Sequence, residues 1–256
     1  DCGMKEEDWF VFLHVDSTGF HQETEDGMNL QHISIEDYFP AIQQVLSAGG
    51  WVIYLGDKSI AKTSTLPKSV VNKVIDYKNH IKRNEEMDLS LIASCRLFIA
   101  TGHNLYSIAQ AFGRPVCFVN VPLLSGFPGY DGDIFLPMLY YSIANHKILN
   151  LKNILSSDLV YADKPHLLAF KGIALLQNTP DEIKETFKEA LSGNNYQIEN
   201  SKTGEEARNK FIELNQTFDR KILGRISLYF STKYAHELFL EKIPGKQNKE
   251  DLAEAL

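Results

Sequence analysis

The segment from Met87 to Asn120 constrains the fold more than any other part of the chain. Its sequence is M-D-L-S-L-I-A-S-C-R-L-F-I-A-T-G-H-N-L-Y-S-I-A-Q-A-F-G-R-P-V-C-F-V-N. The pattern predicts a helix, a buried strand at 97–100, a helix at 105–112 and a strand at 116–119. A Thr-Gly-His-Asn turn joins the first strand to the second helix. In a parallel α/β sheet such a turn lies beyond the carboxyl end of a strand, where backbone N–H groups and the helix dipole favour anionic ligands.

Strands and helices alternate along most of the chain. Apolar runs rich in aromatic and β-branched residues predict further buried strands at 9–15 and 51–55, and the short mixed segment 70–77 is expected to end in a strand at 74–76. A helix is predicted from Ser34 to the Gly49-Gly50 pair, and another from Thr179 to Leu191 with proline at its first position. We therefore expect an α/β fold, with a Rossmann-like parallel sheet and helices on both faces.

The character of the chain changes after Asn120. Segment 122–137 contains three prolines and three glycines, which predicts a ligand-side loop. Segment 148–155 is typical of a short strand or a turn, and 164–173 is ambiguous. A polar linker at 193–204 and helices at 205–218 and 226–240 are expected next. We divide the chain into a sheet domain at 1–192, a helical extension at 193–243 and a flexible tail at 244–256.

Composition excludes several classes of protein. The formal net charge of −7 argues against a general surface for nucleic acid. No apolar run approaches the roughly 20 residues of a membrane helix, so no transmembrane segment is expected. Three cysteines cannot form a closed set of disulfides, which favours a reducing, cytoplasmic location. The first predicted strand begins at Trp9, only a few residues after the first residue of the sequence. We therefore expect a preceding N-terminal domain or a partner chain.

Polar residues at the ends of the predicted strands are the candidate site residues. A general base is expected at the end of the first strand, because proton transfer needs such a group within hydrogen-bond reach of a ligand bound there. The candidates for that role are His14, Asp16 and His21. The candidates for contact with a phosphate or a ribose are Gly56, Asp57, Lys58, Thr101, Gly102, His103, Asn104 and Leu105. The candidates for contact with a sugar or a base are Asp76, Tyr77 and Asp133, and Glu182 is a candidate ribose ligand.

Each candidate also has a structural interpretation. The glycines suit tight turns, the tyrosine suits a packed core and the carboxylates suit helix termini. Asp88 is expected to order the helix behind the site. Asp131 and Asp133 would bind a divalent ion only if both converge, and loop carboxylates are more often solvated, so no metal is expected. A Rossmann dehydrogenase or methyltransferase is disfavoured because no G-x-G-x-x-G follows a strand.

Several motifs occur in an order that resembles a known family. They are F-V-F-L-H-V, G-G-W-V-I-Y-L-G-D, V-I-D-Y, M-D-L-S-L, F-I-A-T-G, A-Q-A-F-G-R-P-V, N-T-P-D-E-I-K-E-T and R-I-S-L-Y-F. In this order they resemble a bacterial glycosyltransferase family that is similar to the donor-binding half of GT-B enzymes. A weaker likeness extends to heptosyltransferases and O-fucosyltransferases. The resemblance covers residues 9–191 and fades toward Leu240.

This resemblance implies a fold and a reaction. The chain would be the C-terminal half of a GT-B glycosyltransferase, binding a nucleotide-sugar donor in the domain at 1–192 without a metal or another cofactor. It would transfer the sugar to a glycan, polysaccharide or protein acceptor, either in the cytoplasm or at the inner face of the cell membrane. Positioning of the reactants and stabilisation of the departing diphosphate would carry the mechanism.

The sequence departs from the family pattern at positions that matter for a diphosphate. Asp16 and Tyr54 stand where the family has arginines, Gln31-His32 replaces Arg-Asn, and His103-Asn104 replaces Ser-Gly. Charge-assisted contacts contribute roughly 1.5 to 3 kcal/mol each, so the losses would abolish donor affinity unless Lys58, Arg114 or His103 compensates. The alternative function is therefore a catalytically degenerate GT-B-like binding module in a larger cell-envelope or glycan-assembly protein.

Overall fold

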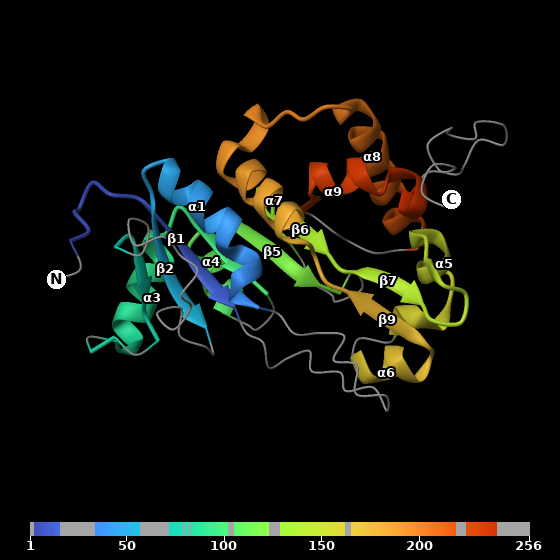
Figure 1. Ribbon diagram of the computed structural model, residues 1–256, viewed down its shortest axis with the longest axis horizontal. Coiled ribbons are helices and arrows are strands. Elements are labelled where there is room, and N and C mark those ends of the chain that lie inside the picture. The colour runs from blue at the N-terminus through green and yellow to red at the C-terminus, as the bar shows by residue number, and fades with distance from the viewer. Residues whose placement is uncertain are drawn as a thin grey trace, which may run out of the picture.

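Seven parallel strands form the central sheet of the protein, which is described by a computed structural model (Figure 1). The structure describes residues 3–15, 34–56, 72–78, 80–81, 83–101, 105–122, 129–161, 165–218 and 224–239. From one edge of the sheet to the other, the strands are β3 (Val74–Asp76), β2 (Trp51–Gly56), β1 (Phe10–Val15), β4 (Leu97–Ala100), β5 (Val116–Val121), β6 (Ile134–Pro137) and β10 (Arg225–Ile226). The predicted α/β class with a Rossmann-like parallel sheet is confirmed.

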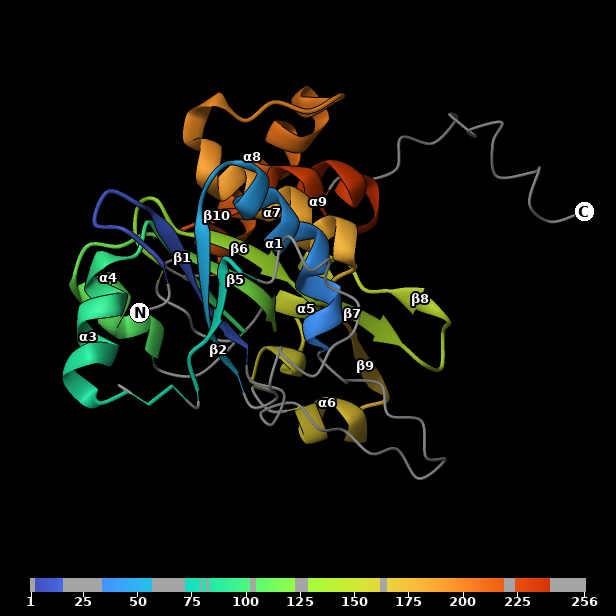
Figure 2. The same cartoon turned by 60° about the vertical axis from the view of Figure 1, so that its left-hand side comes forward.

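Helices cover both faces of this sheet, as Figures 1 and 2 show. One face packs against α1 (Phe39–Ser47) and α7 (Pro180–Ser192), and the other against α3 (Glu85–Ser94) and α4 (Leu105–Ala111). Every residue of β1 is buried, because alternate side chains enter the two cores. The continuous apolar runs in the sequence therefore correspond to strands that are covered on both sides.

A second, antiparallel sheet extends from the end of β6. It contains β7 (Leu139–Ser142), β8 (Lys147–Ile148) and β9 (Ile173–Leu176), with β7 in the middle. The helices α5 (Leu151–Leu155) and α6 (Pro165–Phe170) lie between β8 and β9 in the chain. Because β6 runs into β7 through Met138, the interpretation of 122–137 as a loop was wrong at its carboxyl end. The proline in that strand is its last residue, where a missing N–H is tolerated.

The remaining elements are short 3-10 helices and the C-terminal helices. The 3-10 helices are η2 (Ile35–Tyr38), η4 (Asp158–Tyr161) and η5 (Gly193–Asn195). The C-terminal helices are α8 (Ser201–Thr217), α9 (Leu228–Lys233) and the π-helix η6 (Ala235–Phe239).

Two sequence predictions for this region were wrong. The expected helix at 226–240 begins only at Leu228, because Arg225 and Ser227 donate their N–H groups to the carbonyls of Asp133 and Phe135 and so extend the sheet with β10. It ends at Lys233, and the π-helix η6 follows. The expected linker at 193–204 is helical from Ser201 onward. Gly204 lies inside α8 because a Cβ there would overlap Thr232 and Leu228 of α9.

A reciprocal pair of asparagines closes the carboxyl end of β5. The N–H of Asn120 donates to Oδ1 of Asn178 at 2.7 Å, and the N–H of Asn178 donates to Oδ1 of Asn120 at 2.7 Å. Nδ2 of Asn178 also donates to the carbonyl of Pro137 at 2.8 Å. Asn120 has a φ of +55°, which asparagine tolerates better than most residues. The pair fixes the chain that enters α7 to the ends of β5 and β6.

Asn178→Ala should lower the free energy of unfolding by about 3 kcal/mol, since it leaves the N–H of Asn120 and the carbonyl of Pro137 buried without partners, at about 1–3 kcal/mol each. Urea unfolding followed by circular dichroism would measure the change. Asn209→Ala is the matched control, because Asn209 is exposed on α8 and its substitution should stay within about 0.5 kcal/mol. Equal stability of the two variants would contradict the role of the pair.

Candidate functional site

The strand order reverses between β1 and β4, and this switch point defines the candidate site. The chain proceeds from β1 to β2 and β3 on one side of the sheet, then from β4 to β5 and β6 on the other. In sheets of this order, ligands bind in the crevice outside the carboxyl ends of the strands at the switch point. The last register pair of β1 with β4 joins His14 to Ala100, and the last pair of β1 with β2 joins Val15 to Gly56.

The structure brings four of the predicted site residues to the carboxyl ends of β1, β2 and β4. His14 lies near the end of β1, Gly56 ends β2, Thr101 follows β4 and Leu105 begins α4. His14 and Thr101 are both buried. The other candidates in these loops fall outside the described residues; they are Asp16, His21, Asp57, Lys58, Gly102, His103 and Asn104.

Gly56 is required by its neighbour Tyr54. A Cβ on Gly56 would overlap the Tyr54 hydroxyl, so the tyrosine side chain folds against the glycine at the end of β2. Tyr54 itself is buried in the core beneath α1. The position where the family has an arginine thus holds an aromatic core residue. Gly56 has a packing role that is independent of any ligand.

Asp76 and Tyr77 lie at the end of β3, two strands from the switch point. The ring of Tyr77 is buried with its centroid 6.3 Å from that of Phe12, and its hydroxyl donates to Asp88 at 2.6 Å. Burial and the Asp88 carboxylate raise the pKa of Tyr77 above its ordinary value. These contacts support the interpretation of Tyr77 as a packed core residue. Asp76 is half-buried on β3, the outermost strand on this side of the sheet.

Asp88 joins this tyrosine to the start of α3. Its carboxylate also accepts from Arg83 at 3.3 Å, and the Arg83 guanidinium lies 5.7 Å from the Tyr77 ring. Asn84 caps the helix by accepting the N–H of Met87 at 2.8 Å. These contacts support the expected role of Asp88 in ordering the helix.

Asp133 lies at the amino ends of the parallel strands, whereas the switch point lies at their carboxyl ends. It precedes β6, and Oδ1 accepts the N–H of Val116, the first residue of β5, at 2.7 Å. Oδ2 accepts from the N–H of Tyr130 and from Nε2 of Gln110, each at 2.7 Å. Burial raises the pKa of Asp133, while these three donors lower it. A carboxylate so placed holds the amino ends of two strands, and we remove it from the set of sugar contacts.

Two further residues named in the sequence analysis, Arg114 and Asp131, also lie at the amino ends of the strands. Arg114 precedes β5 and is exposed at the amino end of the sheet, so it cannot replace a phosphate-binding arginine at the carboxyl end. Asp131 is exposed two residues before Asp133. Within the described part of the chain, no group of three or more His, Cys, Asp or Glu residues is arranged to hold a metal ion.

Glu182 has a structural role at the start of α7. Its Oε2 accepts the N–H of Thr179 at 2.8 Å, and Thr179 accepts the N–H of Glu182, which together form a capping box. Its Oε1 accepts from Lys233 and from the Tyr234 hydroxyl, each at 2.7 Å. Burial and this carboxylate raise the pKa of Tyr234 to about 12. Every oxygen of Glu182 is therefore engaged within the protein, which favours the helix-terminus interpretation over ribose binding.

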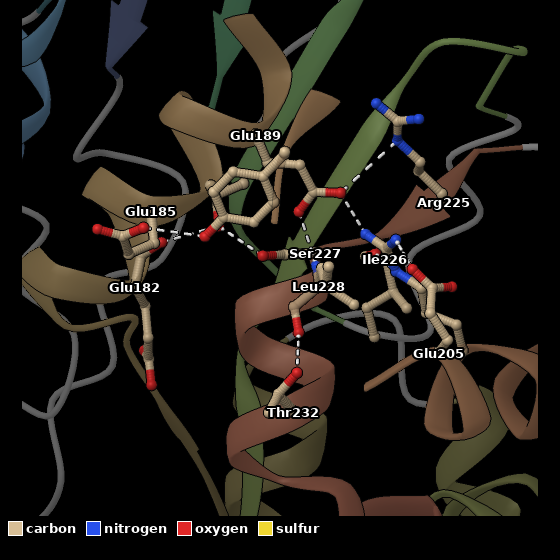
Figure 3. Close-up of polar contacts among 12 residues, drawn as sticks. Glu182, Glu185, Glu189, Glu205, Arg225, Ile226, Ser227, Leu228 and Thr232 are labelled. Atoms are coloured by element: carbon tan, nitrogen blue, oxygen red, sulfur yellow. Dashed lines mark hydrogen bonds and ion pairs between the residues drawn. The ribbon is translucent and has the colours of Figure 1, made fainter. Parts of the chain in front are cut away.

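A second buried carboxylate lies two turns further along α7 (Figure 3). Glu189 accepts from the Arg208 guanidinium and from the N–H of Leu228 at 2.7 Å, and Arg225 lies 3.8 Å away. Between the two glutamates, the Thr186 hydroxyl lies 2.9 Å from the Ser227 hydroxyl. This row of polar contacts attaches α8, β10 and α9 to α7.

Comparisons of the chain with models of protein families, with curated proteins and with solved structures returned no match. No helix among the described residues has the length and apolar character needed to cross a membrane.

Asp133→Ala should lower the free energy of unfolding by about 3 kcal/mol, because it leaves without an acceptor the three donors that now bond to the carboxylate. The measurement is chemical unfolding, with Asp131→Ala as the matched control that changes stability by less than about 0.5 kcal/mol. If Asp133→Ala were as stable as the control, the carboxylate would not hold the two strands and a ligand role would be open again.

Proposed function

We propose that the chain is the nucleotide-sugar-binding part of a metal-independent GT-B-type glycosyltransferase. The reaction would transfer a sugar from an activated nucleotide to a glycan, polysaccharide or protein acceptor. The observation that carries the proposal is the sheet order with its switch point between β1 and β4, where His14 lies near the end of β1 and Thr101 follows β4. Sheets of this order bind nucleotides at that place.

Each candidate contributes a distinct chemistry in this proposal. His14, with Asp16, would take the proton from the acceptor hydroxyl as the sugar is transferred. The Gly56-Asp57-Lys58 and Thr101–Leu105 segments would hold the donor, through backbone N–H groups, the lysine and the aspartate. Asp76 remains a candidate for the sugar or the base. The acceptor site would come from a preceding domain or from a partner chain, in the cytoplasm or at the inner face of the membrane.

A second function is favoured by a specific observation on the charges at this edge. Val15, Gly56, Tyr77, Thr101 and Pro122 lie at or just after the carboxyl ends of β1 to β5, and none of them is a lysine or an arginine. Within two residues of these ends, the only described lysine or arginine is Lys78, after β3. Tyr54 fills a core position and Arg114 lies at the other edge. A diphosphate would then depend on Lys58, His103 and backbone groups. The second candidate is a catalytically degenerate GT-B-like module that binds a partner protein or a glycan.

A thermal-shift panel of nucleoside diphosphates and nucleotide sugars separates the two functions. A donor present at one hundred times its dissociation constant stabilises the fold by about 2.7 kcal/mol, which raises the melting temperature by roughly 5 to 10 °C. We expect a selective shift with one nucleotide family. A flat panel at millimolar ligand would reject donor binding and leave the degenerate module.

Asp57→Ala should weaken the binding of the selected nucleotide about tenfold or more, because it removes a hydrogen bond to a ribose or sugar hydroxyl. Isothermal titration calorimetry measures the affinity. Asp131→Ala is the matched control, since it removes the same charge from the amino edge of the sheet. A nucleotide that binds both variants as tightly as the wild type would bind elsewhere on the protein.

A further inference from the structure

The small sheet ends in a tip that exposes apolar side chains. The tip comprises the β7–β8 turn at Ile143, Ala144, Asn145 and His146 together with α6 and the turn that follows it. Phe170 is 92% exposed, Ile143 45% and Leu167 39%. Aromatic side chains are rarely left in water to this degree, and clustered exposure marks an interaction site.

Backbone contacts keep these three residues at one end of the sheet. The N–H of Ile143 donates to the carbonyl of Gly172 at 3.0 Å, and the N–H of Gly172 donates to Ala169 at 2.8 Å. Leu167 and Phe170 are three residues apart on α6 and share a face, while Leu168 on its other side is buried in the core. The helix is therefore anchored by one side chain and presents two others outward.

The small sheet and its helices carry an excess of lysines. Lys147, at the start of β8, and Lys171, after α6, are exposed at the tip, and Lys171 pairs with Asp158. Over the described part of 138–177 there are three lysines and one aspartate, in a chain whose formal net charge is −7. The described part of this region is thus net positive in an acidic protein.

We propose that this tip docks on an anionic lipid surface. Phe170, Leu167 and Ile143 enter the boundary between headgroups and acyl chains, while the lysines lie at the level of the lipid phosphates. A lipid surface fits better than a protein partner, because protruding apolar side chains on α6 and on the β7–β8 turn, with Lys147 and Lys171 beside them, match a fluid anionic interface. The inference does not depend on the proposed enzymatic function.

Co-sedimentation of the protein with vesicles tests the proposal. Wild type should pellet with vesicles of phosphatidylcholine and phosphatidylglycerol in equal parts, less with phosphatidylcholine alone, and less at high salt, which screens the lysines. Phe170→Ser should weaken binding to the mixed vesicles about tenfold or more, because a buried aromatic side chain is lost from the interface. Lys147→Gln should weaken it roughly fivefold.

Phe112→Ser and Lys202→Gln are the matched controls, since Phe112 is 50% exposed after α4 and Lys202 is exposed on α8. Both should bind like wild type, and unchanged melting temperatures should show that all variants are folded. Equal binding of Phe170→Ser and wild type would overturn the proposal, as would failure of the wild type to pellet. A wild-type dimer that Phe170→Ser converts to a monomer, without vesicle binding, would identify the tip as a protein interface and also overturn it.

Discussion

Two buried carboxylates on α7 hold the C-terminal third of the protein to its sheet. Glu182 accepts from Lys233 and Tyr234, and Glu189 accepts from Arg208 and the backbone of Leu228. A buried ion pair that loses one partner costs about 3–5 kcal/mol, because the remaining charge has no solvent. The packing of α8, α9 and β10 therefore depends on both glutamates keeping all their donors, and neither has an oxygen to offer a ligand.

The position of α7 also limits where a ligand can bind. The residue before its capping threonine is Asn178, which bonds to Asn120 at the carboxyl end of β5. The ends of β5 and β6 are thus closed by the protein's own polar groups. The carboxyl ends of β4, β1, β2 and β3 are not covered by this pair, and the switch point lies between β1 and β4.

The sequence was sufficient for the long elements and for the fold class. Strands such as β4 are continuous apolar runs, and the Thr-Pro-Asp-Glu start of α7 gives both a proline and a capping box. The two-residue strands β8 and β10 could not be predicted, because tertiary pairing and not local pattern creates them. The positive φ of Asn120 is equally invisible in a run of β-forming residues.

Site residues could be placed from the sequence only where the strand next to them could be predicted. The positions of His14 and Thr101 at strand ends follow from the predicted strands that correspond to β1 and β4, whereas the sequence places Asp133 in a loop because it does not predict β6. A residue that precedes a parallel strand lies at the amino edge, so recognition of that one strand decides between a ligand contact and a structural carboxylate.

The small sheet links the two proposals in space. Since β7 continues β6 past the carboxyl ends of the parallel strands, the sheet it forms extends from the same edge as the switch point (Figure 1). A tip docked on lipid would hold that edge near the membrane surface. A donor site held there could act on an acceptor at the membrane while the tip stays bound to the lipid surface. If both proposals hold, acceptors of the cell envelope would be favoured over free sugars, because binding to one surface raises the effective concentration of partners on it.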